Sequence, residues 1–351
     1  MCIPQEFDCN SGEEDLDLLR FTRHLLFVIL LCTALVSCRL PVHRETRFTM
    51  STTLTVLVSS SRPPDWQDLF DFADRKAWEF DHRQEDSPIG KLNREGGGKP
   101  PGEVLEVLQT GQRIAVLSDG AFDPTILALT DLWAFDSGGS LPTDEQIDQA
   151  RRNVDFSKVV IDSDGAVRIP EGFGLDLGGI AKGAVVDLIS DYLYERGYKD
   201  FLIDAGGDIL VSGVKQGGTL WRIAVRHPRS SQTVLGVLSL GEKDSRIAVV
   251  TSGDYERYFE TGGKRYHHIL DPRSGFPAGQ VASVTVIAPT CEIADALSTA
   301  VFVLGPERGL ELLEEMPDVE GLLIAEREGN LSARKTKGFP IDVDSLHFEQ
   351  E

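Results

Sequence analysis

Three oxygen-bearing side chains occur at helical spacing in the C-terminal third of the chain. Asp295, Ser298 and Thr299 fall within residues 292–304, where the apolar pattern predicts a helix. Positions i, i+3 and i+4 lie on one face of a helix. One carboxylate and two hydroxyls are hard ligands that suit Mg²⁺, with waters and substrate oxygens in the other positions. Alternatively, the hydroxyls bond back to helix carbonyls and Asp295 is simply solvated.

A glycine-containing segment, residues 176–183 with the sequence DLGGIAKG, leads into the clearest predicted helix, residues 180–196. Glycines let the backbone approach a ligand closely, and the start of a helix offers unpaired N–H groups to an anion. Lys182 adds a cation in the first turn. These features predict an anion-binding loop, although the same residues could form a tight turn for helix packing.

A third polar segment, residues 265–275, reads RYHHILDPRSG and follows TSGDYERYF at residues 251–259. His268 is the candidate general base, since an imidazole titrates near neutral pH. Asp271 and Arg273 could orient His268, or they could merely close a turn.

These segments must be positioned by a mixture of helices and strands. Apolar periodicity predicts helices over residues 65–80, 102–117, 180–196 and 292–304, and a further helix that opens at 142–145. Strands are predicted over residues 53–58, 159–162, 166–169, 201–211, 221–225, 234–240, 247–251 and 281–287. Residues 81–100 are expected to be a polar loop. The prediction is an α+β fold with mostly antiparallel strands and a single domain over residues 49–346.

The composition limits the possible ligands. The chain has 351 residues, a net charge of −21 and a pI near 4.7. Such a charge repels phosphate backbones, so nucleic-acid binding is not expected. An acidic protein that handles an anionic ligand needs a metal, a helix N-terminus or a few well-placed cations. Cys291 is the only cysteine after residue 38, so no disulfide is expected within the domain.

Residues 1–48 are predicted to be a separate N-terminal segment. An apolar run from Leu25 follows two arginines and ends in Leu35-Val36-Ser37-Cys38. The run is too short to span a bilayer and has the pattern of a signal peptide. Its end resembles a bacterial lipobox, which implies lipidation of Cys38 and anchoring on the periplasmic side of the inner membrane. An uncleaved anchor or a spurious extension are the alternatives.

Taken together and in this order, the three polar segments resemble the FAD:protein FMN transferase family, also called ApbE, over roughly residues 49–325. The resemblance implies an Mg²⁺-dependent enzyme with FAD as its substrate. A Thr or Ser hydroxyl of an acceptor protein, expected to be a subunit of a redox complex, attacks the FMN-side phosphorus of FAD. AMP leaves, and FMN stays on the acceptor through a phosphoester bond.

The resemblance also implies roles for individual residues. The metal ligands are expected to be Asp295, Thr299 and a backbone carbonyl near Gly179, with Ser298 as a further candidate. The FAD contacts are expected to be Met50, Ala121, Phe122, Asp123, Asp176 and Lys182. His268 is expected to be the general base.

The chain departs from the family pattern at two places. Relatives often carry a Tyr that stacks on the flavin, but the matching place near Arg83 has none, so His82 or Arg83 could stack on the ring instead. Asp204 stands where relatives often have Asn. Two other functions therefore remain open, an FAD pyrophosphatase that yields AMP and FMN, and a lipoprotein that binds FAD without chemistry.

Overall fold

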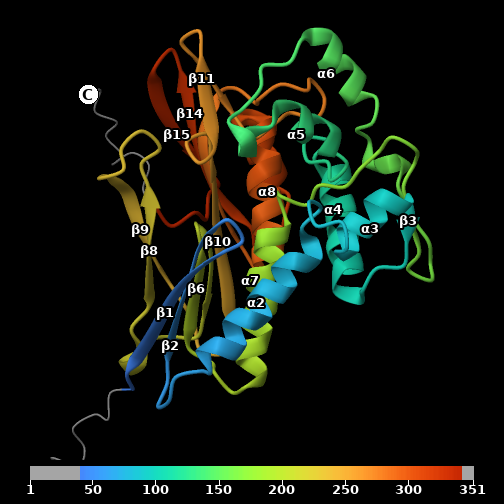
Figure 1. The fold of residues 1–351 in the computed structure, drawn as a ribbon. Coiled ribbons are helices and arrows are strands. Elements are labelled where there is room, and N and C mark those ends of the chain that lie inside the picture. Colours follow the sequence, from blue (N-terminus) through green and yellow to red (C-terminus); the bar gives the residue numbers. More distant parts are fainter. Residues whose placement is uncertain (1–39, 342–351) are drawn as a thin grey trace, which may run out of the picture. The chain divides into compact units, whose positions relative to one another are not determined.

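An eight-stranded antiparallel sheet forms the framework of the chain from Val42 onward (Figure 1). The computed structural model describes residues 40–341. The strand order is β1-β2-β6-β7-β10-β13-β14-β15, and every neighbouring pair is antiparallel. The strands are β1 Val42–Thr49, β2 Thr52–Ser59, β6 Phe201–Ala205, β7 Asp208–Ser212, β10 Arg246–Gly253, β13 Val281–Ala288, β14 Glu320–Arg327 and β15 Asn330–Lys335.

Both faces of this sheet are covered, and each cover has its own apolar core. Helices α2 (Trp66–Phe80), α7 (Ala181–Glu195) and α8 (Cys291–Leu304) cover one face, and α9 (Pro306–Glu314) follows α8. The hairpin of β8 (Trp221–Arg226) and β9 (Val234–Leu240) packs on the other face, where Trp221 is fully buried. Strand β13 is buried at all eight of its positions because it lies between the two covers.

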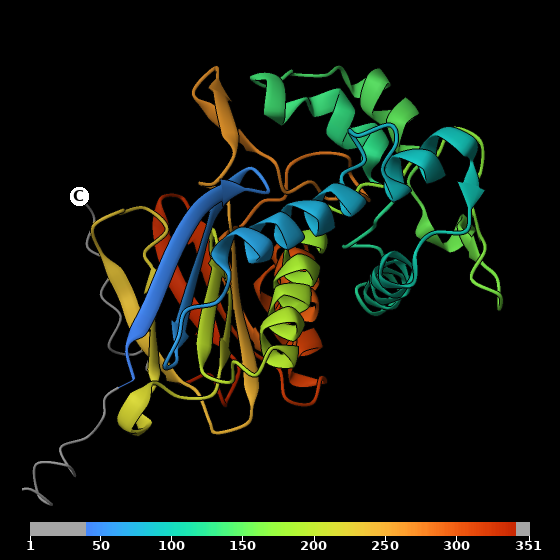
Figure 2. The same ribbon diagram turned by 60° about the horizontal axis from the view of Figure 1, so that its bottom comes forward.

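A second group of helices lies on the side of α2 and α8 that faces away from the sheet (Figure 2). It consists of α3 (Pro88–Glu95), α4 (Gly102–Leu117), α5 (Leu127–Trp133) and α6 (Asp144–Arg151). A three-stranded sheet of β3 (Gly97–Gly98), β5 (Val167–Arg168) and β4 (Val160–Ile161) joins them. The hairpin of β11 (Tyr258–Thr261) and β12 (Lys264–His267) pairs only with itself within the described residues. Three short 3₁₀ helices cover Phe135–Ser137, Phe156–Lys158 and Gln216–Gly218.

The predicted α+β class with mostly antiparallel strands is confirmed, and helix α4 has the predicted bounds. The expectation of a loop over residues 81–100 is wrong, because α3 forms within it. Ser87 caps this helix by accepting a hydrogen bond from Gly90 N at 2.9 Å, and Pro88 occupies its first position. Strand β1 lies in residues that the sequence analysis assigned largely to the N-terminal segment, whereas Cys38 and the apolar run lie outside the described residues.

Helices α7 and α8 approach each other very closely near their N-termini. A Cβ atom on Gly183 would lie 2.3 Å from the carbonyl oxygen of Cys291 and 2.9 Å from Cβ of Asp295. Asp187 then fixes the start of α8, since its carboxylate accepts hydrogen bonds from the backbone N–H groups of Cys291 and Glu292 at 2.9 and 2.8 Å. The absence of a side chain at Gly183 therefore sets the distance between α7 and α8, the helix that carries Asp295 and Thr299.

We expect Gly183→Ala to destabilise the fold by about 1–3 kcal/mol, because backbone atoms of α8 would have to move to admit the methyl group. Urea unfolding measures this loss. Gly102→Ala is the matched control, since a Cβ there meets no atom within 4 Å and should change stability by less than about 1 kcal/mol. Equal stability of the two variants would contradict the proposed role of Gly183.

Candidate active site

The structure brings three of the predicted metal ligands together where the loop before α7 crosses α8. Asp295 is 5% exposed, and its Oδ2 accepts a hydrogen bond from Gly183 N at 3.0 Å. A Cβ on Gly179 would lie 3.3 Å from Oγ1 of Thr299, so the glycine backbone passes directly over this hydroxyl. The Asp295 carboxylate and the Thr299 hydroxyl are therefore both covered by the segment that runs from Gly179 to Gly183.

Ser298 is placed differently from Asp295 and Thr299. Its side chain is fully buried, and its hydroxyl donates to the carbonyl of Asp295 at 2.9 Å. The same oxygen lies 2.7 Å from Oγ of Ser252 on β10. These contacts correspond to the alternative in which the hydroxyl bonds back to the helix, and they join α8 to the central sheet.

Lys182 and Asp208 form an ion pair beside Asp295. Asp208 opens β7 and is 1% exposed, while 29% of the Lys182 side chain is exposed. Burial and the adjacent Asp295 carboxylate raise the pKa of Asp208 well above its usual range. Although burial opposes it, the carboxylates of Asp208 and Asp295 raise the pKa of Lys182. The ammonium group therefore stays charged in this cluster of two acids.

The predicted FAD-contacting segment at residues 121–123 lies beside the same loop. Ala121 and Phe122 are buried, and a Cβ on Gly179 would lie 3.1 Å from the Phe122 ring. The Asp123 carboxylate accepts hydrogen bonds from Thr125 N and Oγ1 at 2.7 and 2.6 Å and from Phe156 N at 2.9 Å. Burial raises the pKa of Asp123. Its carboxylate holds two loops together, so a ligand contact would come from other atoms of the segment.

Asp176 lies at the start of the glycine loop and faces His82. Its Oδ1 accepts a hydrogen bond from Gly178 N at 2.8 Å and lies 3.6 Å from Nδ1 of His82. Both side chains are partly exposed, at 12% and 21% respectively. Asp176 is one of the predicted FAD contacts, and His82 is one of the two candidates for the flavin-stacking position.

Met50 occupies the tight turn between β1 and β2. Met50 and Ser51 have φ values of 53° and 57°, which is the left-handed region typical of two-residue hairpin turns. The turn lies beside the one that joins β6 to β7, because a Cβ on Gly206 would lie 2.1 Å from Oγ1 of Thr52. Met50 packs against the main core. Its turn lies at the end of the sheet where β7 begins with Asp208.

The imidazole of His268 is held by the backbone of Arg257. His268 N donates to the carbonyl of Arg257 at 3.0 Å, and Nδ1 lies 3.2 Å from the same oxygen. A carbonyl can only accept, so Nδ1 carries the proton and Nε2 keeps its lone pair. Burial, with the Arg257 guanidinium and His267 as further causes, lowers the pKa of His268 to about 3. The ring is therefore neutral at physiological pH.

The carboxylate of Asp136 links Arg257, whose carbonyl holds His268, to Arg83, near the position where a Tyr was expected. Asp136 accepts from Arg257 Nη1 at 2.9 Å and from Arg83 Nη1 at 3.0 Å, and Arg83 also donates to Asp81 at 2.8 Å. All of these groups except Asp81 are about half exposed. Arg83 is therefore oriented by two carboxylates.

Asp271 and Arg273 close a turn. Asp271 Oδ1 accepts from Arg273 N and Nε at 2.9 and 2.8 Å, and the Asp271 carbonyl accepts from Gly275 N at 2.7 Å. These bonds correspond to the second of the two roles considered from the sequence.

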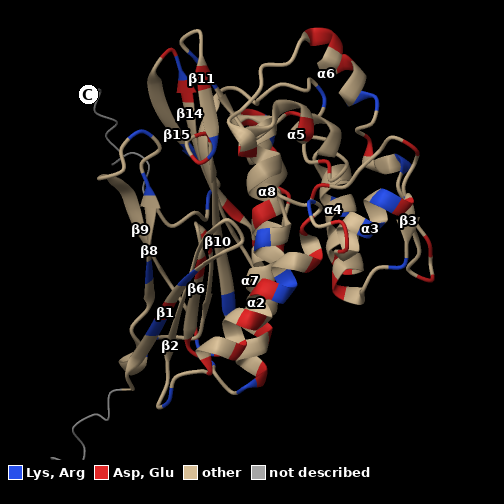
Figure 3. Ribbon diagram, in the orientation of Figure 1, with Lys and Arg blue, Asp and Glu red and all other residues tan. Residues whose placement is uncertain are grey.

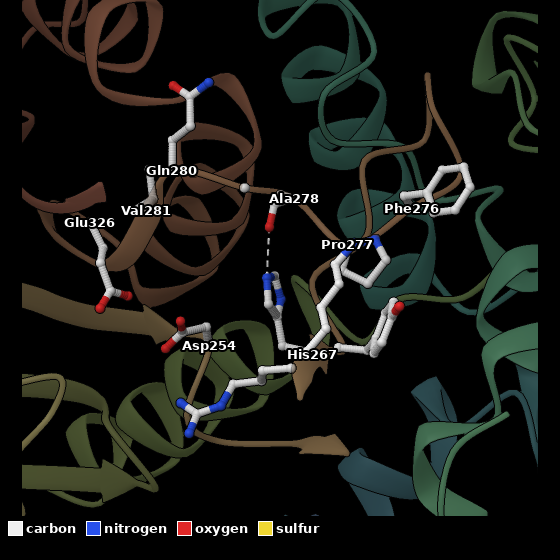
Figure 4. A pocket seen from close by; sticks show the side chains of 12 residues that line it. Asp254, His267, Phe276, Pro277, Ala278, Gln280, Val281 and Glu326 are labelled. Carbon is white, nitrogen blue, oxygen red and sulfur yellow. Dashed lines mark hydrogen bonds between the residues drawn. The ribbon is translucent and has the colours of Figure 1, made fainter. Parts of the chain in front are cut away.

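The neighbouring His267 faces the other way and has a structural role. Its Nε2 donates to the carbonyl of Ala278 at 2.7 Å, and Nδ1 accepts from Ile269 N at 3.3 Å (Figure 4). It borders a cavity of about 280 Å³ that also contacts Asp254, Phe276, Gln280 and Glu326. None of the predicted FAD or metal residues borders this cavity.

The surroundings of the site are acidic. Asp and Glu recur along α2 and α6 (Figure 3). Within residues 40–341 no group of three or more His, Cys, Asp or Glu side chains could hold a metal. The candidate metal centre therefore depends on one or two carboxylates and on neutral oxygens.

Sequence reasoning did not single out Asp208, Asp136 or Arg257 as parts of the site. Asp208 directly follows Gly206-Gly207, and a carboxylate after two glycines is a detectable signal of a buried turn. Asp136 and Arg257 carry no such signal, because the two residues of this ion pair are 121 positions apart in the sequence.

Comparison with known proteins places the chain among flavin-handling enzymes. A sequence profile of the ApbE family matches residues 50–323. A protein of Treponema pallidum named FAD:protein FMN transferase is 33% identical over 313 residues, which cover 82% of this chain and 85% of the relative. A relative of the same name from Vibrio cholerae is 35% identical over 66% of this chain and 70% of its own length.

Solved structures agree with the sequence matches. The ApbE protein of Thermotoga maritima superposes with a TM-score of 0.77 at 32% identity, over 85% of this chain and 97% of that one. The flavin transferase ApbE of Vibrio cholerae gives a TM-score of 0.74 at 29% identity, over 86% of this chain and all of that one.

Proposed function

The chain belongs to the ApbE family, and from this premise we propose that it is an FAD:protein FMN transferase. The observation that carries the proposal is the crossing of the glycine loop over α8. There, Gly183 N binds Asp295 at 3.0 Å and Gly179 faces the Thr299 hydroxyl. This arrangement gathers hard oxygen ligands at one point, where a bound Mg²⁺ would supply the positive charge that an acidic protein needs in order to hold a pyrophosphate.

The proposed reaction is a phosphoryl transfer. The hydroxyl oxygen of an acceptor Thr or Ser attacks the FMN-side phosphorus of FAD and forms a new P–O bond. The P–O bond to the bridging oxygen breaks, and AMP leaves with that oxygen. Because little covalent work falls to the protein, its residues position the pyrophosphate, neutralise charge and take up the hydroxyl proton.

We propose that Asp295, Thr299 and the Gly179 carbonyl hold Mg²⁺. The donor set fits this ion, since it offers hard oxygens and leaves positions for water and phosphate. When bound, Mg²⁺ would neutralise negative charge on the pyrophosphate. Ser298 is less suited, because its hydroxyl already bonds to Asp295 O and Ser252.

His268 suits the role of general base through its geometry. The Arg257 carbonyl fixes the proton on Nδ1, so Nε2 is the atom that accepts the hydroxyl proton. A bound anionic substrate favours the protonated ring and so raises the pKa of His268 from its value of about 3 toward the range useful for catalysis.

His82 is the better candidate for the flavin-stacking position left by the missing Tyr. Its ring lies 3.6 Å from the carboxylate of Asp176 and is partly exposed, whereas Arg83 is engaged by Asp81 and Asp136. A planar imidazole at this place would stack on the isoalloxazine ring, and Asp176 would hold it in position.

We also propose that lipidation of Cys38 anchors the protein at the periplasmic face of the inner membrane, where its acceptor would be a redox-complex subunit. The apolar run from Leu25 and the Leu35–Cys38 sequence support this proposal. No helix within residues 40–341 is long and apolar enough to cross a membrane.

Asp295→Ala should lower Mg²⁺-dependent labelling of an acceptor protein by more than about 100-fold, because it removes the charged ligand. Covalent flavin fluorescence of the acceptor on a denaturing gel measures transfer, and chromatography of free FMN measures hydrolysis. Ser298→Ala is the control on the same helix and should retain the Mg²⁺ response. Free FMN without labelled acceptor would identify the wild-type protein as a pyrophosphatase, and unchanged FAD would exclude both activities.

His268→Gln should slow transfer by about 10²- to 10⁴-fold and leave FAD binding intact, since the ring acts on the acceptor proton. Stopped-flow transfer rates and quenching of FAD fluorescence separate the two effects. His43→Gln on β1 is the control and should behave as the wild type. Loss of FAD binding in His268→Gln would make His268 a ligand contact instead of a base.

The mature protein isolated from membranes should begin at a lipidated Cys38, and Cys38→Ser should release it into the soluble fraction. Mass spectrometry of the N-terminal peptide measures the modification. An unmodified N-terminus upstream of Cys38 would contradict the proposed anchor.

A further inference from the structure

Asp208 is a fully buried carboxylate of which only one oxygen has a partner. Its Oδ1 pairs with Nζ of Lys182, whereas Oδ2 has no hydrogen-bond partner within residues 40–341. The residue is 1% exposed. Buried carboxylate oxygens are normally hydrogen-bonded, because leaving one without a partner costs its full desolvation energy. An ionised Asp208 therefore leaves Oδ2 open to a donor that does not belong to the protein, such as a water molecule.

The neighbours of Asp208 show what kind of partner this is. The carboxyl groups of Asp208 and Asp295 are close enough to interact directly, and Lys182 supplies one positive charge between them. When both acids are ionised, the two carboxylates and one ammonium have a net charge of −1 in a buried volume. Such a cluster is complementary to a divalent cation or to the water molecules that the cation carries.

A tight turn between β6 and β7 positions Asp208 beside Lys182 and Asp295. Gly206 and Gly207 have φ values of 62° and 101°, so the chain reverses there, and Asp208 is the first residue of β7. Leu210, two residues on, points into the core shared with the helices, and side chains two apart share one face of a strand. Asp208 therefore faces α7 and α8 from the sheet.

We propose that Asp208 is a positioning residue of the metal centre, whose Oδ2 accepts a hydrogen bond from a water molecule bound to Mg²⁺. The inference rests on the proposed function, because it takes Asp295 and Thr299 as the direct ligands. The metal centre would then be enclosed by three elements: the loop before α7, helix α8 and the start of β7. Lys182 holds the Asp208 carboxylate in place through its ion pair with Oδ1.

Asp208→Asn tests this role, since it keeps the shape and the acceptor for Lys182 but removes the charge. Titration of the full chain with MgCl₂ alone, followed by calorimetry, should show a dissociation constant about 10- to 100-fold higher than in the wild type. Asp204→Asn is the matched control in the preceding strand. Its side chain accepts a bond from Gly207 N that an amide can also accept, so its Mg²⁺ affinity should equal that of the wild type.

A second variant separates a local contact from a general electrostatic effect. Asp208→Asn combined with Lys182→Met removes one charge of each sign, so the net charge of the cluster is unchanged and a buried unpaired ammonium is avoided. We expect this double variant to show the same loss of Mg²⁺ affinity as Asp208→Asn. It also provides the measurement if the single variant does not fold.

Affinity within twofold of the wild type in either folded variant would overturn the proposal and make Asp208 a plain counterion of Lys182. The metal titration is independent of transferase activity. If the wild type binds Mg²⁺ but labels no acceptor, the proposed function fails while the role of Asp208 stands. If the wild type labels the acceptor and the variants bind Mg²⁺ normally, only the role of Asp208 fails.

Discussion

The close backbone contact between α7 and α8 is the constraint on which the candidate site depends. Gly183 has no side chain, so its N–H reaches the carboxylate of Asp295, and the glycine loop before it passes over Thr299. Any side chain at Gly183 would separate the helices and move the loop away from the predicted ligands. Asp187, one turn further along the same face of α7, secures this crossing by capping α8. This contact therefore determines both the packing of the two helices and the position of the predicted metal ligands.

This arrangement resolves the difficulty of an acidic protein that binds an anion. The chain carries a net charge of −21, which on its own would repel a pyrophosphate. The positive charge at the site would instead come from the expected metal ion, with the ammonium of Lys182 beside it. Because Lys182 pairs with the buried Asp208, the cation stays fixed and charged. The acidic remainder of the surface then disfavours competing polyanions.

Local signals in the sequence predicted most of the framework and the centre of the site. Apolar periodicity located α2, α4 and α7, because each of these helices buries one face, and α8 was recognised as a helix that is apolar over most of its length. The spacing of Asp295 and Thr299 indicated a shared face because helical geometry is local. Helix α3 was missed because it is only eight residues long and half of them are polar, and because its start depends on the Ser87 cap. The partners of Asp208 and Asp136 were unpredictable from spacing, since only the assembled sheet and loops bring them together.

The departure near Arg83 has a structural counterpart that bears on the base. Asp136 joins Arg83 to Arg257 by accepting a hydrogen bond from each guanidinium. The carbonyl of Arg257 in turn sets the proton on Nδ1 of His268. Each exposed ion pair contributes only about 0–1 kcal/mol to stability, so the link adds little to folding. Its effect is on geometry, because Asp136 joins the Arg83 guanidinium to the residue whose carbonyl orients His268.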